Sequence, residues 1–223
     1  MKNLQKIAGL CALLEAFIYI GVFVLYGTML ATPSNLSIAE KLAFLKEKQQ
    51  ILFLVNLIGY ILFGLILAVL VLALHERFQV RSKTLSQLAS IFGILWVGLV
   101  ITSGMLSNIG LSTVLKLSTT EPEQTRALWL AVSTVAEALG GGNEVVGGMW
   151  VLLISIAGMR AQSLPRTLHF LGIGVGLVGI ATCIPGRLLT DVFGVSQILW
   201  FSYLGLTLLT QASEPSKRDS ALT

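Results

Sequence analysis

Long apolar runs alternate with short polar connectors along the whole chain. A helix needs about 20 apolar residues to cross the ~30 Å hydrocarbon layer of a bilayer, and runs of this length recur throughout the sequence. The pattern therefore predicts an all-α, polytopic membrane protein with six transmembrane helices. The expected spans are residues 7–29, 51–74, 85–106, 134–159, 168–184 and 192–209.

The composition indicates that residues 1–223 form a single membrane domain. Hydrophobic residues make up 55% of the chain and charged residues only 12%, which leaves too little polar surface for a water-soluble domain. The net charge of +4 lies in connectors next to the spans, as expected for membrane topology or contact with anionic lipid. The lipid bilayer is thus the expected partner, and nucleic acid is not. The first apolar run exceeds that of a signal peptide, so we expect a retained anchor.

Basic residues predict the orientation in the membrane. The short connectors 77–83 and 160–166 are rich in Arg and Lys, whereas most basic residues of the other connectors are accompanied by Glu or Asp. Short basic connectors stay in the cytoplasm. An even number of spans then places both termini in the cytoplasm as well.

Two connectors contain signals for a helix start. Residues 37–40 read as a capping box, and the segment that follows has apolar Leu42 and Leu45 on one side, so we expect an amphipathic helix on the outer surface. Residues 120–123 read as a second capping box, with Pro122 in the first turn of a segment that leads into the fourth span.

A shift of 83 residues brings these two capping boxes into register, and it also aligns Arg77 with Arg160 and Gly93 with Gly176. Residues 37–103 and 120–186 would then be repeat units that run the same way through the membrane, an arrangement found in some small transporters. The alternative is that membrane hairpins converge on similar composition.

The segment 157–180 follows a glycine-interrupted apolar helix and contains a Pro-Arg turn. Its distinctive residues are Ser163-Leu164-Pro165-Arg166, Leu168, Leu171-Gly172 and Gly176. In these features it resembles the last third of an uncharacterised family of short bacterial multi-pass membrane proteins, known only as a domain of unknown function. The resemblance implies a bacterial inner membrane and about six helices, and it assigns no functional residue.

Acidic residues within the spans are candidates for function, because a carboxylate in the hydrocarbon layer is costly to retain. Glu15 lies about 13 Å from Lys6 at the cytoplasmic start of the first span, on a flank shared with Tyr19 and beside a ridge of small residues, so we expect it to face the other helices. We expect Glu15, Tyr19 and Asn56 to line a ligand-binding interior. The alternative for Glu15 is a protonated, hydrogen-bonded side chain that contacts no ligand. Asn56 has a second interpretation, as a hydrogen-bonded link between helices.

The fourth span contains a second polar cluster. Glu137 and Glu144 are seven residues apart and therefore share a helix face, with Asn143 and three glycines beside them. They could form a polar vestibule that binds a ligand. The alternative is that both acids border water and pair with Arg126 or Arg187.

His75 and His169 fall at the same depth on different spans, which is the arrangement that a bis-histidine haem site requires. The sequence shows no metal-ligand cluster and no catalytic motif, and it assigns no other cofactor. The segment 174–179 matches G-x-G-x-x-G, but it lies within a span, so we interpret it as a surface for close helix packing.

Three classes of function remain after this reading. Binding or transport of a small molecule or ion within the bundle is favoured by the repeat and the intramembrane acids. A structural or partner subunit of a larger membrane complex is favoured by the small size and the scarcity of polar groups. An enzyme or b-type haem carrier is the least favoured class.

Overall fold

We describe a computed structural model of the chain, which places residues 2–31, 36–118, 120–184 and 186–213. Within these ranges all regular secondary structure is helical, and there are no strands. The elements in order are α1 (Lys2–Thr28), α2 (Ile38–Glu47), α3 (Gln49–Asn56), the π-helix η1 (Leu57–Leu62), α4 (Phe63–Leu117), α5 (Pro122–Ala161), α6 (Arg166–Ala181) and α7 (Arg187–Ser213).

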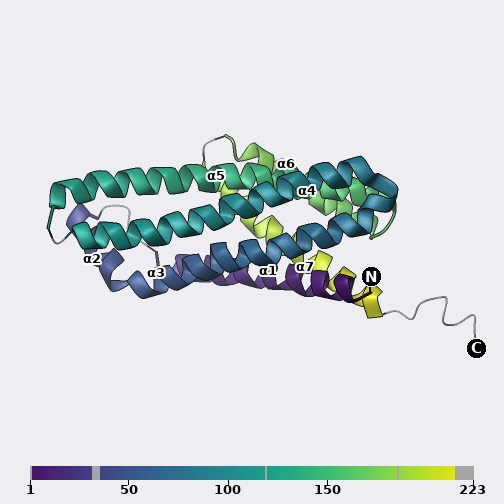
Figure 1. Cartoon of the computed structure of the whole chain (residues 1–223), viewed down its shortest axis with the longest axis horizontal. Coiled ribbons are helices and arrows are strands. Elements are labelled where there is room, and N and C mark those ends of the chain that lie inside the picture. The colour runs from purple at the N-terminus through teal and green to yellow at the C-terminus, as the bar shows by residue number, and fades with distance from the viewer. Residues whose placement is uncertain (1, 32–35, 119, 185, 214–223) are drawn as a thin grey trace, which may run out of the picture.

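The described helices pass along the bundle six times, so the predicted number of spans is confirmed. The second and third passes belong to one continuous helical stretch, residues 49–117, which reverses at Ser82 (Figure 1). Ser82 has the non-helical dihedral angles φ −146° and ψ 53°. Four helical stretches are long and apolar enough to cross a membrane by themselves, and α6 is a shorter apolar helix of 16 residues.

Arg77 shows that the start of α1 and the end of α7 meet at one end of the bundle. Its guanidinium donates hydrogen bonds to Gln5 near the start of α1 and to Gln211 near the end of α7. It also donates to the side chain and the backbone carbonyl of Ser163, between α5 and α6, at 2.7 and 3.0 Å. We call this the terminal end of the bundle and the other the far end.

At the far end the helices extend past the spans expected from hydropathy. The third span was expected to end at residue 106 and the fourth to begin at residue 134. Instead, α4 continues to Leu117 and α5 begins at Pro122. The 40 residues of α5 make a helix of about 60 Å, twice the thickness of the hydrocarbon layer. The α4–α5 hairpin therefore extends past α6 and α7, with α2 and α3 beside it (Figure 1).

One of the two predicted capping boxes is confirmed. The Ser37 hydroxyl accepts from the backbone N–H of Glu40, and the Glu40 carboxylate accepts from the backbone N–H and the hydroxyl of Ser37. These hydrogen bonds hold the pKa of Glu40 below its usual range. The amphipathic α2 that follows buries Leu45.

The prediction of a second capping box at residues 120–123 is wrong. The residue that caps α5 is Glu121, which makes no side-chain capping bond, while the Thr120 hydroxyl donates back to the carbonyl of Leu117. The turn is thus closed by the preceding helix, and the fixed φ of Pro122 suffices to start α5.

Glycines allow α5 and α6 to cross at close range, as the G-x-G-x-x-G segment predicted. A Cβ on Gly148 would lie 2.7 Å from the carbonyl oxygen of Gly176, and one on Gly172 would clash with Ser155. A Cβ on Gly174 would meet nothing within 4 Å, so this glycine is on the outward face. Small residues at the contact face are the usual basis of helix packing in membranes.

Large aromatic side chains fill the centre of the bundle. Trp96, Trp150 and Trp200 are buried and contact one another in series, with ring centroids 5.7 and 5.6 Å apart. Gly147 packs on Trp96 and Gly93 packs on Trp150, so two glycines make room for the bulky rings. This aromatic column links the middle of α4 to α5 and α7.

Candidate functional site

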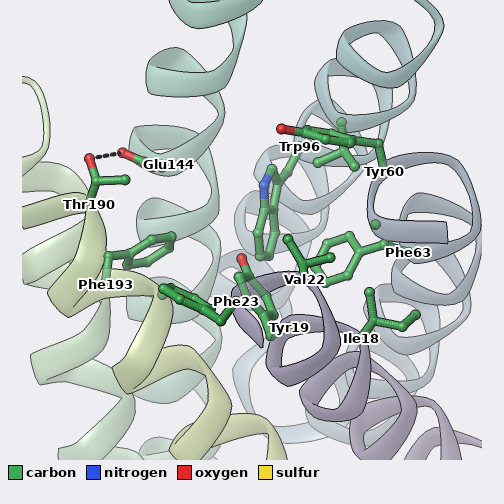
Figure 2. Close-up of a pocket in the computed structure, with 13 residues that line it drawn as sticks. Ile18, Tyr19, Val22, Phe23, Tyr60, Phe63, Trp96, Glu144, Thr190 and Phe193 are labelled. Atoms are coloured by element: carbon green, nitrogen blue, oxygen red, sulfur yellow. Dashed lines mark hydrogen bonds between the residues drawn. The ribbon is translucent and has the colours of Figure 1, made fainter. Parts of the chain in front are cut away.

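A cavity of about 180 Å³ lies beside the aromatic column, within the membrane-spanning part of the bundle. Its walls come from α1, η1, α4, α5 and α7 (Figure 2). The π-helical turn η1 contributes Gly59 and Tyr60. Single π-helical turns widen an α-helix and are frequent at functional sites, and here the turn falls where the chain borders the cavity.

The walls of the cavity are mainly aromatic. Tyr19 and Phe63 meet edge to face, with ring centroids 5.3 Å apart, and Phe63 meets Trp96 at 5.7 Å. Figure 2 shows the hydroxyl groups of Tyr19 and Tyr60 directed toward the middle of the space. The aromatic lining residues are Tyr19, Phe23, Tyr60, Phe63, Trp96 and Phe193.

Glu144 is the acidic side chain that lines the cavity. Its carboxylate accepts a hydrogen bond of 3.1 Å from the Thr190 hydroxyl, across the space from Tyr60 (Figure 2). Among the residues that line the cavity, Glu144 is the only carboxylate, and none is Lys, Arg or His. In the described part of the chain the side chain of Glu144 forms no ion pair with Arg126 or Arg187.

An acid within an aromatic box has a definite chemical preference. The faces of Trp, Tyr and Phe rings carry partial negative charge and attract cations, most strongly where water is excluded. A carboxylate on the same wall adds full charge complementarity. With no basic side chain among its walls, the cavity fits a compact organic cation far better than an anion.

Glu15 is fully buried, so its predicted orientation toward the other helices is confirmed. Neither of its carboxylate oxygens has a hydrogen-bond partner in the described structure. The residues that line the cavity do not include Glu15. Glu15 lies one helical turn from Tyr19, toward the terminal end. Its role as a ligand contact stays a prediction.

Of the six predicted ligand-binding residues, the cavity brings together Tyr19 and Glu144. Asn56 points elsewhere: its amide donates a 3.0 Å hydrogen bond to Asn108, and the two link α3 to α4. This is the second interpretation given above for Asn56. Glu137 is exposed, and the side chain of Asn143 lies outside the described part of the structure.

The two histidines make separate contacts near the terminal end. The Nδ1 atom of His75 pairs with the Ser86 hydroxyl at 2.9 Å, across the turn at Ser82. The ring of His169 is buried against Phe78 and borders a space of about 10 Å³, enough for about one water molecule. The residues around that space do not include His75. No three His, Cys, Asp or Glu residues of the described ranges gather as a metal site.

Sequence reasoning missed Tyr60, Trp96 and Thr190. Tyr60 and Trp96 look like ordinary aromatic residues of a span, and Thr190 falls in a connector before the last predicted span. Tyr60 is next to Gly59 in the middle of a span, and this Gly-Tyr pair was the one available sign of an irregular turn. No local pattern in the sequence indicates that the three residues meet.

Comparisons with known proteins add no assignment. No protein-family model, no curated protein and no solved structure matches this chain. The function is therefore argued from the cavity itself.

Proposed function

We propose that this protein binds a small organic cation inside its transmembrane bundle, in the cavity between Tyr19, Tyr60 and Glu144. The observation that carries the proposal is one acidic side chain in an otherwise aromatic cavity without a basic residue. The cavity volume of about 180 Å³ suits a compact group such as a quaternary ammonium. Glu144 would provide charge, and the aromatic faces would exclude water and select a cation.

The setting of the site follows from the same features. The apolar helices support a multi-pass membrane protein, and the basic connectors at the terminal end support a cytoplasmic location for both termini. We propose the bacterial inner membrane, in line with the resemblance of residues 157–180 described above. Under this orientation the cavity lies nearer to the outer surface than to the cytoplasm.

Binding of tetramethylammonium to the purified protein in nanodiscs tests the proposal. Calorimetric titration should show saturable binding to the wild type, with empty nanodiscs as the blank. Glu144→Gln keeps the size and the hydrogen bond of the side chain but removes its charge. Tetramethylammonium has no N–H to donate, so the substitution removes the Coulomb attraction at about 4 Å, between about 1 kcal/mol in water and about 4 kcal/mol at an effective dielectric constant of about 20. Binding should therefore weaken by roughly fivefold to several hundredfold.

Glu137→Gln is the matched control, because Glu137 lies on the same helix but is exposed and does not line the cavity. It should change the dissociation constant by less than about twofold. The proposal fails if the wild type binds no quaternary ammonium, or if the two substitutions weaken binding equally.

The α4–α5 hairpin supports the second candidate function, a partner subunit of a membrane complex. Ile109, Leu130 and Val135 expose 59%, 56% and 49% of their surface on this hairpin. A photoreactive amino acid at Leu130 should then give one discrete adduct in cells. The same probe at Leu177, exposed on α6, serves as the control for contacts made by chance in the lipid.

A further inference from the structure

A second hollow adjoins the cavity on the outside of the bundle. It is a groove of about 360 Å³ between α1 and the α3–η1 segment, and none of its lining side chains is polar. Phe17, Leu54 and Ile58 at the groove are exposed, and on a membrane-spanning bundle this exposed surface faces lipid. The groove is therefore open sideways to the bilayer.

The groove and the cavity share a wall. Ile18 and Val22, one turn apart on α1, line both hollows. Val22 packs directly on the backbone of Gly59, since a Cβ at that glycine would lie 2.8 Å from Val22 Cγ2. A single layer of aliphatic side chains thus separates the lipid-facing groove from the aromatic cavity, next to the irregular turn η1.

We propose that the ligand is an amphipathic cation with one alkyl chain, which enters from the bilayer with its head in the cavity and its chain in the groove. This inference rests on the proposed function for the head group. The aromatic, acidic cavity selects the charged head. The groove lies directly behind Ile18 and Val22, so a chain that displaces these two side chains reaches the groove from the cavity and lies there without exposure to water.

Gly21 offers a clean way to block the groove. It lines the groove, and a Cβ added there would meet nothing within 4 Å, so the larger side chain of Gly21→Leu starts without a clash and occupies part of the hollow. Gly98→Leu is the matched control, because a Cβ at Gly98 also meets nothing within 4 Å and this residue lines neither hollow.

The experiment compares dodecyltrimethylammonium with tetramethylammonium on the protein in nanodiscs, each corrected for partition into empty nanodiscs. Gly21→Leu should weaken binding of the dodecyl compound about tenfold, as for the loss of roughly two methylene contacts. It should leave tetramethylammonium binding within about twofold, as should Gly98→Leu for both compounds.

The outcomes separate the two proposals. If tetramethylammonium does not bind at all, the proposed function fails, and this inference fails with it. If tetramethylammonium binds but Gly21→Leu affects the dodecyl compound no more than Gly98→Leu does, only the inference is overturned.

A photoreactive group in the alkyl chain gives a readout that does not depend on the variants. On the wild-type protein the adducts should map to α1 and to residues 51–58, and excess dodecyltrimethylammonium should suppress them. Adducts spread over the lipid-facing surface of α6 and α7 would mean partition into the bilayer only, and would overturn the inference.

Discussion

Glu15 provides the sharpest test of how the bundle tolerates buried polar groups. Its side chain is fully buried, and both carboxylate oxygens lack a partner among the described residues. A buried polar group without a hydrogen bond costs about 1–3 kcal/mol by protein mutational data. Insertion of an acid at mid-membrane costs about 2.5–3.5 kcal/mol on translocation scales. If Glu15 serves packing alone, this cost reduces the stability of the folded protein.

Two substitutions separate packing from function. Glu15→Leu is similar in volume and removes the buried polar group, so the unfolding free energy should rise by about 2 kcal/mol. Glu15→Gln keeps a buried polar group, so its unfolding free energy should stay within about 1 kcal/mol of the wild type. Titration with SDS, followed by tryptophan fluorescence of the protein in mixed micelles, measures both values.

Gln197 is an internal control for this reasoning. It is fully buried on α7, and its amide oxygen and nitrogen also lack partners in the described structure. Gln197→Met should therefore stabilise the protein in the same direction as Glu15→Leu. If Glu15→Leu destabilises while Gln197→Met stabilises, the carboxyl group makes a favourable contact, and the argument from uncompensated burial is refuted for Glu15. That outcome would favour a bound ligand or ion at this position.

Three further predictions concern the packing and the topology of the bundle. Gly148→Ala would press a methyl group onto the backbone of α6 and should destabilise by about 2 kcal/mol in the same SDS titration, whereas Gly174→Ala on the open face should not destabilise. Arg77→Met should cost about 3 kcal/mol, since it removes the hydrogen bonds to three segments, and Arg81→Met, which removes a single bond, should cost less. A reporter fused after Lys83 should be cytoplasmic, and a reporter on the outer side would overturn the proposed orientation.

The number of spans could be predicted because each pass contains a long, mainly apolar run with few charged residues, and the hydrocarbon layer requires such runs. Hydropathy indicates the spans but not how far the helices continue past them. Residues 107–133 mix polar and apolar side chains, so hydropathy alone reads them as a connector. They stay helical because α4 and α5 pack on each other there: a Cβ on Gly110 would lie 2.4 Å from Val132.

The sequence indicated single residues of the site, but not that they meet in one cavity. Tyr19 and Glu144 were candidates because polar groups are rare within spans, but no local pattern shows that α1 and α5 face the same cavity. Tyr60 and Trp96 join them through tertiary packing and through the π-helical turn, which a single sequence does not reveal. The repeat of residues 37–103 and 120–186 stays a prediction. One of its paired features, the capping box, is present only in the first unit.

The aromatic column determines what can happen to a bound ligand. Trp96 forms part of the cavity wall and contacts Trp150, which in turn contacts Trp200 and Phe201. All four side chains are buried, so the column fills the core on the side of the cavity that Trp96 borders. A cation seated against Trp96 can move farther in that direction only if the column shifts. If the cavity binds a cation as proposed, Trp96 is the side chain through which the occupied cavity would act on the rest of the core.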